Sequence, residues 1–197
     1  MLRGVQVRIR FAAAGAALAV ALSCPVASQA GEVHLSSYSV GQPPDGISAF
    51  CRGFAGACHK ARGAATPADD AAMLAAAQTI NREVNRAITP GEIGRHPWRL
   101  IENGPGDCTN YVAAKKHRLI GAGVPADRLL AAIVLGQDNG LHAVLVLRLG
   151  TGDVVLDNLD DAIRPWARTR YTFLKMQNRA DGGRWDIVLM GPRASRL

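Results

Sequence analysis

The sequence predicts an α+β domain in which helices come first along the chain and an antiparallel sheet follows. Residues 66–91 carry an apolar stripe at helical spacing, which favours a long amphipathic helix. Residues 129–157 instead contain apolar runs of β character, separated by the turn sequences "QDNG" and "GTGD". The change from the first pattern to the second predicts this order of helices and strands.

The first thirty residues are typical of a secretory signal peptide. A head with three arginines precedes an apolar run at Phe11–Ser23, and small residues follow up to Ala30. The run has 13 residues, fewer than the ~20 that a helix needs to span a bilayer. We therefore expect cleavage after Ala30 and a periplasmic or secreted product without a stable membrane span. Lipid modification of Cys24 is the alternative, but the three residues before it match the usual pattern poorly.

The remaining residues, 31–197, are enough for a single domain with its own core. Loss of the first thirty lowers the number of basic residues from 23 to 20 against 16 acidic residues, which is a net charge of +4. These basic residues are scattered and do not alternate with stacking aromatics, so we do not expect nucleic acid as a partner. The sequence contains neither repeats nor a stretch with the composition of a long linker.

The long helix has signals at both ends. Thr66 is suited to cap it, Pro67 to occupy its first turn, and the following aspartates to face the positive end of the helix dipole. Pro90 and Gly91 end it. The stripe that we expect to pack in the core consists of Met73, Ala77, Ile80, Val84 and Ile88.

A second helix is predicted from Cys108 to Ile120, where the sequence "GAGVP" ends it. The predicted strands are "LLAAIVLG", "LHAVLVLRLG" and "DVVLDNL", and further strands are expected in "YTFLKMQN" and "RWDIVLM".

The three cysteines that follow the signal peptide have different surroundings. Cys51 and Cys58 are seven residues apart within the Gly-, Pro- and Ser-rich segment 31–66, which we expect to be largely irregular. In an oxidising compartment such a close pair favours a disulfide. A metal site that adds His59 is the rival interpretation, but it lacks a fourth ligand at a recognisable spacing. Cys108 is then the odd thiol, which in a secreted protein is either reactive or joined to another molecule.

Cys108 has the surroundings of a nucleophile. Cysteine reacts as a thiolate, and the unpaired N–H groups at the start of a helix stabilise negative charge. Gly104, Gly106 and Asp107 precede Cys108 in "NGPGDCTNYV", and glycines let a substrate backbone approach closely. This context alone is weak evidence, and a buried structural cysteine is the alternative.

His142 is the candidate base because it opens the predicted strand "HAVLVLRL" directly after a turn. From this position an imidazole can reach a helix N-terminus that packs across the sheet. The alternative is a core histidine that bonds a backbone carbonyl. The other histidines after the signal peptide lie in loops or on the expected solvated face of the second helix: His34, His59, His96 and His117.

Asp157 is the candidate partner that orients His142. It is an acid within the apolar run "VVLDNL", and a buried carboxylate is costly unless it is paired. A hairpin closed by "RLGTGD" puts both residues on one face of the sheet. A turn at Leu149-Gly150 would place them opposite each other, whereas a turn at Thr151-Gly152 would leave Asp157 four residues from the partner of His142. Asn158 is a second candidate for the orienting role.

With these motifs in this order, the chain resembles the bacterial transglutaminase-like cysteine peptidases, a family within the papain/transglutaminase fold. The resemblance covers residues 51–185 and includes the cysteine pair, "INREVNRAI", Trp98, "GDCTNYVAAKKHRLIGAGVP", "HAVLVLRLGTGDVVLDN", "RPW" and "FLKMQ". It implies a catalytic cysteine at a helix N-terminus packed against an antiparallel sheet. It also implies that Cys108, His142 and Asp157 form the triad of nucleophile, base and orienting acid.

The same resemblance implies a peptidase that hydrolyses a peptide or amide bond through a thioester acyl-enzyme and requires no cofactor. Its substrate would be a protein or peptide of the cell envelope. The backbone N–H of Cys108 would form part of the oxyanion hole. Trp98 would either line the cleft or pack against the helix. An acyltransferase would use the same triad.

The chain departs from the family at two positions. The family commonly reads Gly-Asp-Cys-Glu-Asp-Tyr, whereas this chain has Thr109 and Asn110 after the cysteine. Some members resemble calcium-dependent proteases that hold the ion with acids flanking the cysteine. Because calcium prefers several carboxylate oxygens, a tight site is disfavoured here, and Asp107 and Asn110 are only weak calcium candidates. The departure also supports a second hypothesis, an idle binding or regulatory module. A third, a structural envelope protein, predicts a buried and unreactive Cys108.

Overall fold

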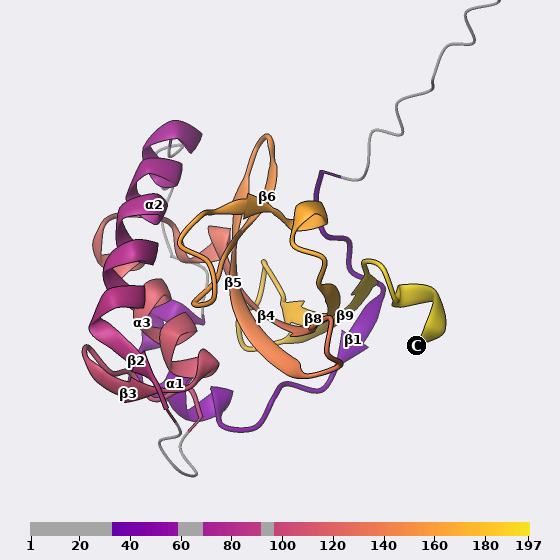
Figure 1. Ribbon diagram of the computed structural model, residues 1–197, viewed down its shortest axis with the longest axis horizontal. Coiled ribbons are helices and arrows are strands. Elements are labelled where there is room, and N and C mark those ends of the chain that lie inside the picture. Colours follow the sequence, from indigo (N-terminus) through magenta and orange to yellow (C-terminus); the bar gives the residue numbers. More distant parts are fainter. Residues whose placement is uncertain (1–32, 59–68, 92–96) are drawn as a thin grey trace, which may run out of the picture.

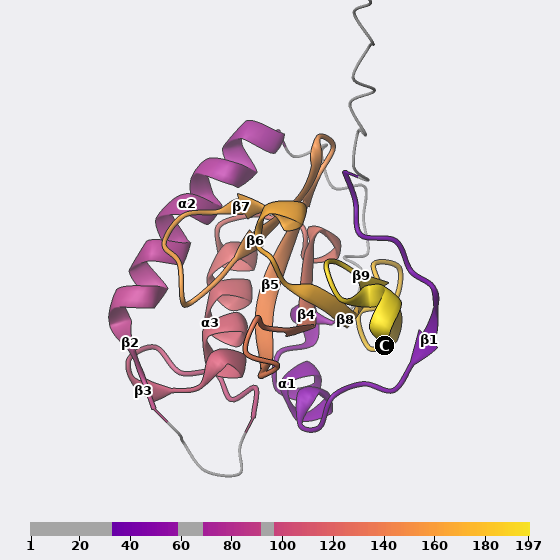
Figure 2. The ribbon, with the colours of Figure 1, turned by 45° about the vertical axis from the view of Figure 1, so that its right-hand side comes forward.

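The fold consists of a seven-stranded antiparallel sheet with helices α2 and α3 packed on one side of it (Figures 1 and 2). The computed structural model describes residues 33–58, 69–91 and 97–197. The strand order is β1-β9-β8-β4-β5-β6-β7, and every neighbouring pair in it is antiparallel. The predicted α+β class is confirmed. The predicted signal peptide lies outside the described residues.

The strands of the sheet are β1 (Ser39–Gly41), β4 (Leu129–Leu135), β5 (Leu141–Leu149), β6 (Gly152–Leu156), β7 (Arg164–Pro165), β8 (Thr172–Gln177) and β9 (Trp185–Met190). The helices are α1 (Ile47–Gly53), α2 (Asp70–Ala87) and α3 (Cys108–Gly121), with 3-10 turns η1 (Ala55–Ala57), η2 (Ala126–Arg128), η3 (Trp166–Arg168) and η4 (Ala194–Arg196). Strands β2 (Ile88–Pro90) and β3 (Gly104–Gly106) form a separate parallel pair. Among the described helices, none combines the length and apolar character needed to cross a membrane.

The sheet has a hydrophobic core on each face because successive side chains of a strand point to opposite sides. In β5, Leu145 and Leu147 pack toward the helices, while Val144 and Val146 pack on the other face. The predicted stripe faces the helical side of the core and is buried throughout: Met73, Ala77, Ile80, Val84 and, in β2, Ile88.

Helix α2 begins later than the sequence signals suggested. Asp69 caps it, and its carboxylate accepts a hydrogen bond from the N–H of Ala71 at 3.0 Å. The predicted cap Thr66 and the first-turn residue Pro67 lie outside the described part of the chain.

The parallel pair β2–β3 fixes the chain immediately before α3, and the sequence patterns did not reveal it. Pairing brings Gly106 so close to β2 that a Cβ atom at this position would lie 2.9 Å from Cγ2 of Ile88. It would also lie 2.6 Å from Cδ1 of Ile101. Real Cβ atoms essentially never show such short contacts. Glycine at position 106 therefore allows β3 to lie close to β2 immediately before α3 begins.

The sequence left two registers open for the β5–β6 hairpin, and the observed register lies between them. Leu149 pairs with Gly152, so the turn is at Gly150-Thr151. Asp70, in the first turn of α2, holds this turn by accepting a hydrogen bond from the N–H of Gly150 at 2.6 Å. Both predicted turn positions were therefore wrong by one residue, but Asp157 still belongs to the same face of the sheet as His142.

The segment before Cys58 is more regular than expected. Its described part contains strand β1, which pairs with β9, and helix α1. The predicted disulfide between Cys51 and Cys58 is confirmed, and it joins α1 to the residue after η1. Pairing with β9 organises residues 39–41, which have no periodic pattern of their own, while about half of the described residues 33–58 lie outside helices and strands.

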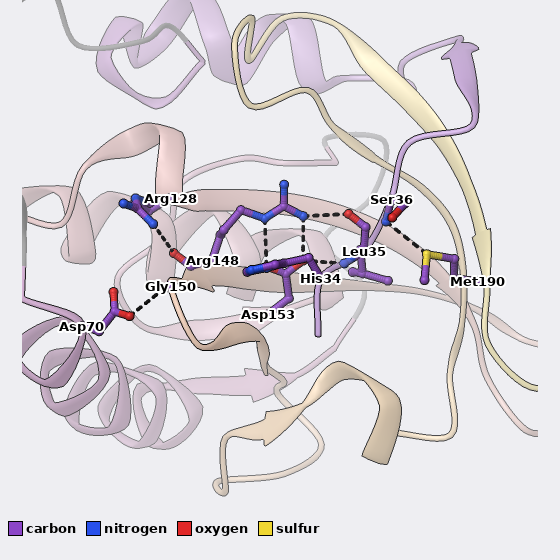
Figure 3. A network of polar contacts seen from close by, with 9 residues as sticks. All are labelled: His34, Leu35, Ser36, Asp70, Arg128, Arg148, Gly150, Asp153 and Met190. Carbon is purple, nitrogen blue, oxygen red and sulfur yellow. Dashed lines mark hydrogen bonds and ion pairs between the residues drawn. The ribbon is translucent and has the colours of Figure 1, made fainter. Parts of the chain in front are cut away.

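A buried polar network attaches the start of the described chain to the β5–β6 hairpin (Figure 3). The carboxylate of Asp153, which is 1% exposed, accepts two hydrogen bonds from Arg148 at 2.7 and 2.8 Å. It also accepts one from the N–H of Leu35 at 2.8 Å and contacts Nδ1 of His34 at 3.1 Å. Burial alone would raise the pKa of Asp153, but the bonds to Arg148, His34 and Leu35 lower it below its usual value.

Candidate active site

Cys108 is the first residue of α3 and is half-buried, and its thiol is not part of a disulfide. Asp107 caps the helix, with its carboxylate accepting hydrogen bonds from the N–H groups of Thr109 and Asn110. The Asn110 side chain returns a bond to the Asp107 N–H, which completes a capping box. The sulfur therefore lies at the end of the helix where the dipole favours negative charge.

His142 lies at the start of β5 and bonds Asp157, which directly follows β6. Nε2 of His142 is 2.9 Å from Oδ1 of Asp157, and the side chains are 14% and 9% exposed. Asn158, the second candidate for the orienting role, is not the residue that bonds the imidazole.

The carboxylate of Asp157 has two further hydrogen-bond donors. The hydroxyl of Tyr171 donates to Oδ2 at 2.6 Å, and the N–H of Leu159 donates to Oδ1 at 3.1 Å. Burial raises the pKa of Asp157, but the bonds from His142 and Tyr171 outweigh it, so that the pKa is lower than usual. The carboxylate is therefore ionised at neutral pH. Tyr171 was missed in the sequence, where a tyrosine at the start of a strand carries no distinguishing signal.

Two asparagines of α2 hold the loop that follows Asp157. Asn85 donates to the backbone oxygen of Asp157 at 3.0 Å and to Oδ1 of Asp161 at 2.9 Å. Asn81, which is fully buried, donates to the backbone oxygens of Asp160 and Asp161 at 3.1 and 3.2 Å. These residues were also missed, although their spacing of four puts them on one face of the helix and could have indicated a shared role.

Cys108 and His142 line one cavity of about 370 Å³. Burial lowers the pKa of His142, but hydrogen bonds to Asp157 and to the Cys108 side chain, with the charges of both, raise it to about 9. The imidazole is therefore protonated at neutral pH. The rest of the wall is largely apolar and includes Pro43, Pro44, Ile133 and Leu141.

This geometry agrees with a family comparison. A family model described as "Bacterial transglutaminase-like cysteine proteinase BTLCP" matches residues 37–191. The chain belongs to the bacterial transglutaminase-like cysteine proteinase family. It is accordingly a cysteine peptidase, as the resemblance implied.

Comparison with solved structures shows the fold of this cysteine proteinase. Legionella pneumophila LapG in a calcium-bound form matches with a TM-score of 0.50 and 20% identity, over 60% of this chain and 71% of LapG. Another LapG structure matches with a TM-score of 0.49 and 22% identity, over 63% and 73% of the two chains. The first likeness shows a papain/transglutaminase-like fold. No curated protein matches the chain.

In this cysteine proteinase Trp98 packs in the core. It is 2% exposed, and its ring lies edge-on to that of Trp185 with centroids 6.1 Å apart. Trp98 therefore packs in the core and is not among the residues that line the cavity of Cys108. His117 is also not on a solvated face, because it is half-buried with its ring 4.4 Å from that of Phe54.

The lysines of α3 are buried, which the sequence did not indicate. Nζ of Lys116 donates to Oε1 of Gln177 at 2.6 Å, and burial lowers the pKa of Lys116 to about 7. Burial also lowers the pKa of Lys115 to about 7, although the charges of Asp157 and Asp161 act in the opposite direction.

The two weak calcium candidates, Asp107 and Asn110, take part in hydrogen bonds at the start of α3. Within the described residues there is no group of three or more His, Cys, Asp or Glu side chains that could hold a metal ion. Of the weak candidates, Asp107 uses Oδ1 for capping, and Asn110 uses both ends of its amide. The rival metal site at Cys51 and Cys58 is excluded because these sulfurs form the disulfide, while His59 lies outside the described part of the chain.

Proposed function

We propose that this protein is a periplasmic cysteine peptidase that uses Cys108, His142 and Asp157 as its triad. The observation that carries this proposal is the 2.9 Å bond between His142 and Asp157 beside the cavity that also contains Cys108. The bond occupies Nε2 and leaves Nδ1 of His142 for the sulfur. The secretory character of the first thirty residues supports the periplasmic location.

The reaction begins with a charged pair. With a pKa of about 9, His142 is an imidazolium at neutral pH and stabilises the Cys108 thiolate. The thiolate attacks the carbonyl carbon of the scissile bond, and the backbone N–H of Cys108 stabilises the oxyanion that forms. The imidazolium then gives its proton to the leaving nitrogen as the C–N bond breaks, which leaves a thioester on Cys108.

Hydrolysis of the thioester restores the enzyme. Neutral His142 takes a proton from a water molecule as that water attacks the thioester carbonyl. Collapse of the second tetrahedral intermediate releases the carboxylic acid and the thiolate, and His142 is again an imidazolium. Asp157 keeps the ring in one tautomer and orientation throughout, and Tyr171 and Leu159 keep Asp157 in place.

A protein or peptide of the cell envelope is the proposed substrate class. The cavity beside Cys108 has largely apolar walls, which also include Asp45 and Lys175, and Leu141 is 71% exposed at its edge. An extended peptide would cover this apolar surface while its carbonyl group approaches the sulfur.

Alkylation of Cys108 by iodoacetamide tests the charged pair. At neutral pH and below, the mature protein should react faster than a His142→Ala variant, because the variant lacks the imidazolium that stabilises the thiolate. Cys108→Ser serves as the unreactive control. Equal profiles for the mature protein and His142→Ala would contradict the proposal and favour an idle module.

The substrate itself can be found by comparing envelope extracts. Extract treated with the active protein should contain new protein N-termini that are missing after treatment with Cys108→Ala. The Cys108→Ala variant should in turn retain the uncleaved substrate. New N-termini that arise equally with both proteins would count against peptidase activity.

A further inference from the structure

A short loop that includes Trp98 and Arg99, called here the Trp98 loop, is hydrogen-bonded to the start of α3. Trp98 has a backbone φ of 65°, in the left-handed region that residues other than glycine rarely adopt. Its side chain is buried against Trp185. Such a backbone conformation persists only where the surrounding structure imposes it. The two side chains that bond this loop are Thr109 and Asn110, the residues at which the chain departs from the acidic family pattern.

The hydroxyl of Thr109 links the loop to the helix cap. It accepts a hydrogen bond from the N–H of Trp98 at 2.8 Å and donates one to Oδ1 of Asp107 at 2.6 Å. This position requires one acceptor and one donor on the same small group, which a hydroxyl provides. A carboxylate here could accept from Trp98, but it would place a second negative charge beside Asp107.

Asn110 makes the second attachment. Its Nδ2 donates to the backbone oxygen of Arg99 at 2.9 Å, while its Oδ1 accepts from the N–H of Asp107 at 2.9 Å. The side chain is fully buried. An aspartate could accept from Asp107 but could not donate to Arg99, so two oxygens would face each other in a buried place.

The two substitutions thus change how charge is balanced beside the cysteine. Acids at positions 109 and 110, together with Asp107, would bring three carboxylates to one helix end, and a divalent cation would relieve their repulsion. Here Asp107 is the one carboxylate of this group, and neutral side chains make the connections instead. Calcium takes six to eight oxygen ligands, and the oxygens of Thr109 and Asn110 are already engaged in hydrogen bonds.

We propose that Thr109 and Asn110 fasten the Trp98 loop to the N-terminus of α3 in place of a bound calcium ion. The protein therefore reaches its folded, stable state without calcium. This inference does not depend on the proposed peptidase activity, because it concerns the stability of the loop and helix.

The first test compares the mature protein in EGTA and in 1 mM calcium chloride. Thermal unfolding, followed by circular dichroism and by tryptophan fluorescence, should give the same Tm within 1 °C in both solutions, since a ligand that binds the folded state would raise it. Isothermal titration with calcium should show no saturable heat. A calcium-dependent rise in Tm or a saturable titration would overturn the proposal.

The second test asks whether the two side chains carry the attachment. Thr109→Val keeps the shape but removes the hydroxyl, and it should lower Tm by about 3–8 °C in EGTA. Thr109→Ser, which retains the hydroxyl, is the matched control and should lose less than half as much. Asn110→Asp should also lower Tm in EGTA. If Thr109→Val and Asn110→Asp are both as stable as the parent protein, the attachment is refuted, whatever the peptidase assays show.

Discussion

The hydroxyl of Tyr171 donates a 2.6 Å hydrogen bond to Oδ2 of Asp157, while Oδ1 of the same carboxylate bonds Nε2 of His142. The rings of Tyr171 and His142 also lie near each other, with centroids 5.7 Å apart. Tyr171 thus fixes the position of the acid that in turn fixes the imidazole.

Replacing Tyr171 with phenylalanine should lower kcat by about tenfold with little change in KM. The substitution removes one hydrogen bond to a charged group and keeps the ring packed, so orientation of His142 suffers more than binding of substrate. Steady-state kinetics on a cleaved peptide measure both constants. A rise in KM at constant kcat would show that Tyr171 instead contacts substrate.

Asp157→Asn should have a larger effect, with kcat lower by about 10²–10⁴-fold. An amide lacks the charge that favours the imidazolium, so the pKa of His142 should fall below its value of about 9. The alkaline limb of the activity profile should then move to lower pH. An unchanged limb would mean that another group sets it.

Stability should decrease in mildly alkaline solution. The folded pKa of His142, about 9, is above the ordinary value of 6.5, so its contribution is fully present below pH ~6.5 and is lost as pH rises through about 9. Urea unfolding at pH 6, 7.5 and 9 measures this loss. In a His142→Ala variant, the free energy of unfolding should depend less on pH over this range. An equal pH dependence in both proteins would mean that other groups cause the loss.

Arg148→Met should lower the free energy of unfolding by about 3–5 kcal/mol at pH 7, because it leaves the buried Asp153 carboxylate without its main partner. The double variant with Asp153→Asn should recover part of this loss. The folded pKa of Asp153 is depressed, so its contribution is present above the unfolded value of ~3.9 and is lost as pH falls through the folded value. The difference in free energy of unfolding between Arg148→Met and the parent protein should therefore become smaller at acidic pH.

Local patterns were sufficient to predict the parts of the site that come from single elements. The apolar stripe identified α2, and the glycines and Asp107 before Cys108 identified the start of α3. The close cysteine pair identified the disulfide. Each of these features depends on residues that are near one another in the sequence.

The features that escaped prediction depend on distant residues. Tyr171 reaches the carboxylate of Asp157 only because β8 and β6 lie in one sheet. Asn85 reaches the backbone oxygen of Asp157 only because α2 packs on that sheet. The turn of the β5–β6 hairpin is held by Asp70 from another element. A single sequence contains the residues for these contacts but gives no sign of which residues meet.

The two-residue turn at Gly150-Thr151 also limits how this gene can change. A surface turn remote from the cysteine usually tolerates insertions and deletions. Here, gaining or losing one codon would shift the β5–β6 pairing by one residue and direct the Asp157 side chain away from His142. Natural selection for proteolytic activity should therefore preserve the length of this turn, even where the residues within the turn change.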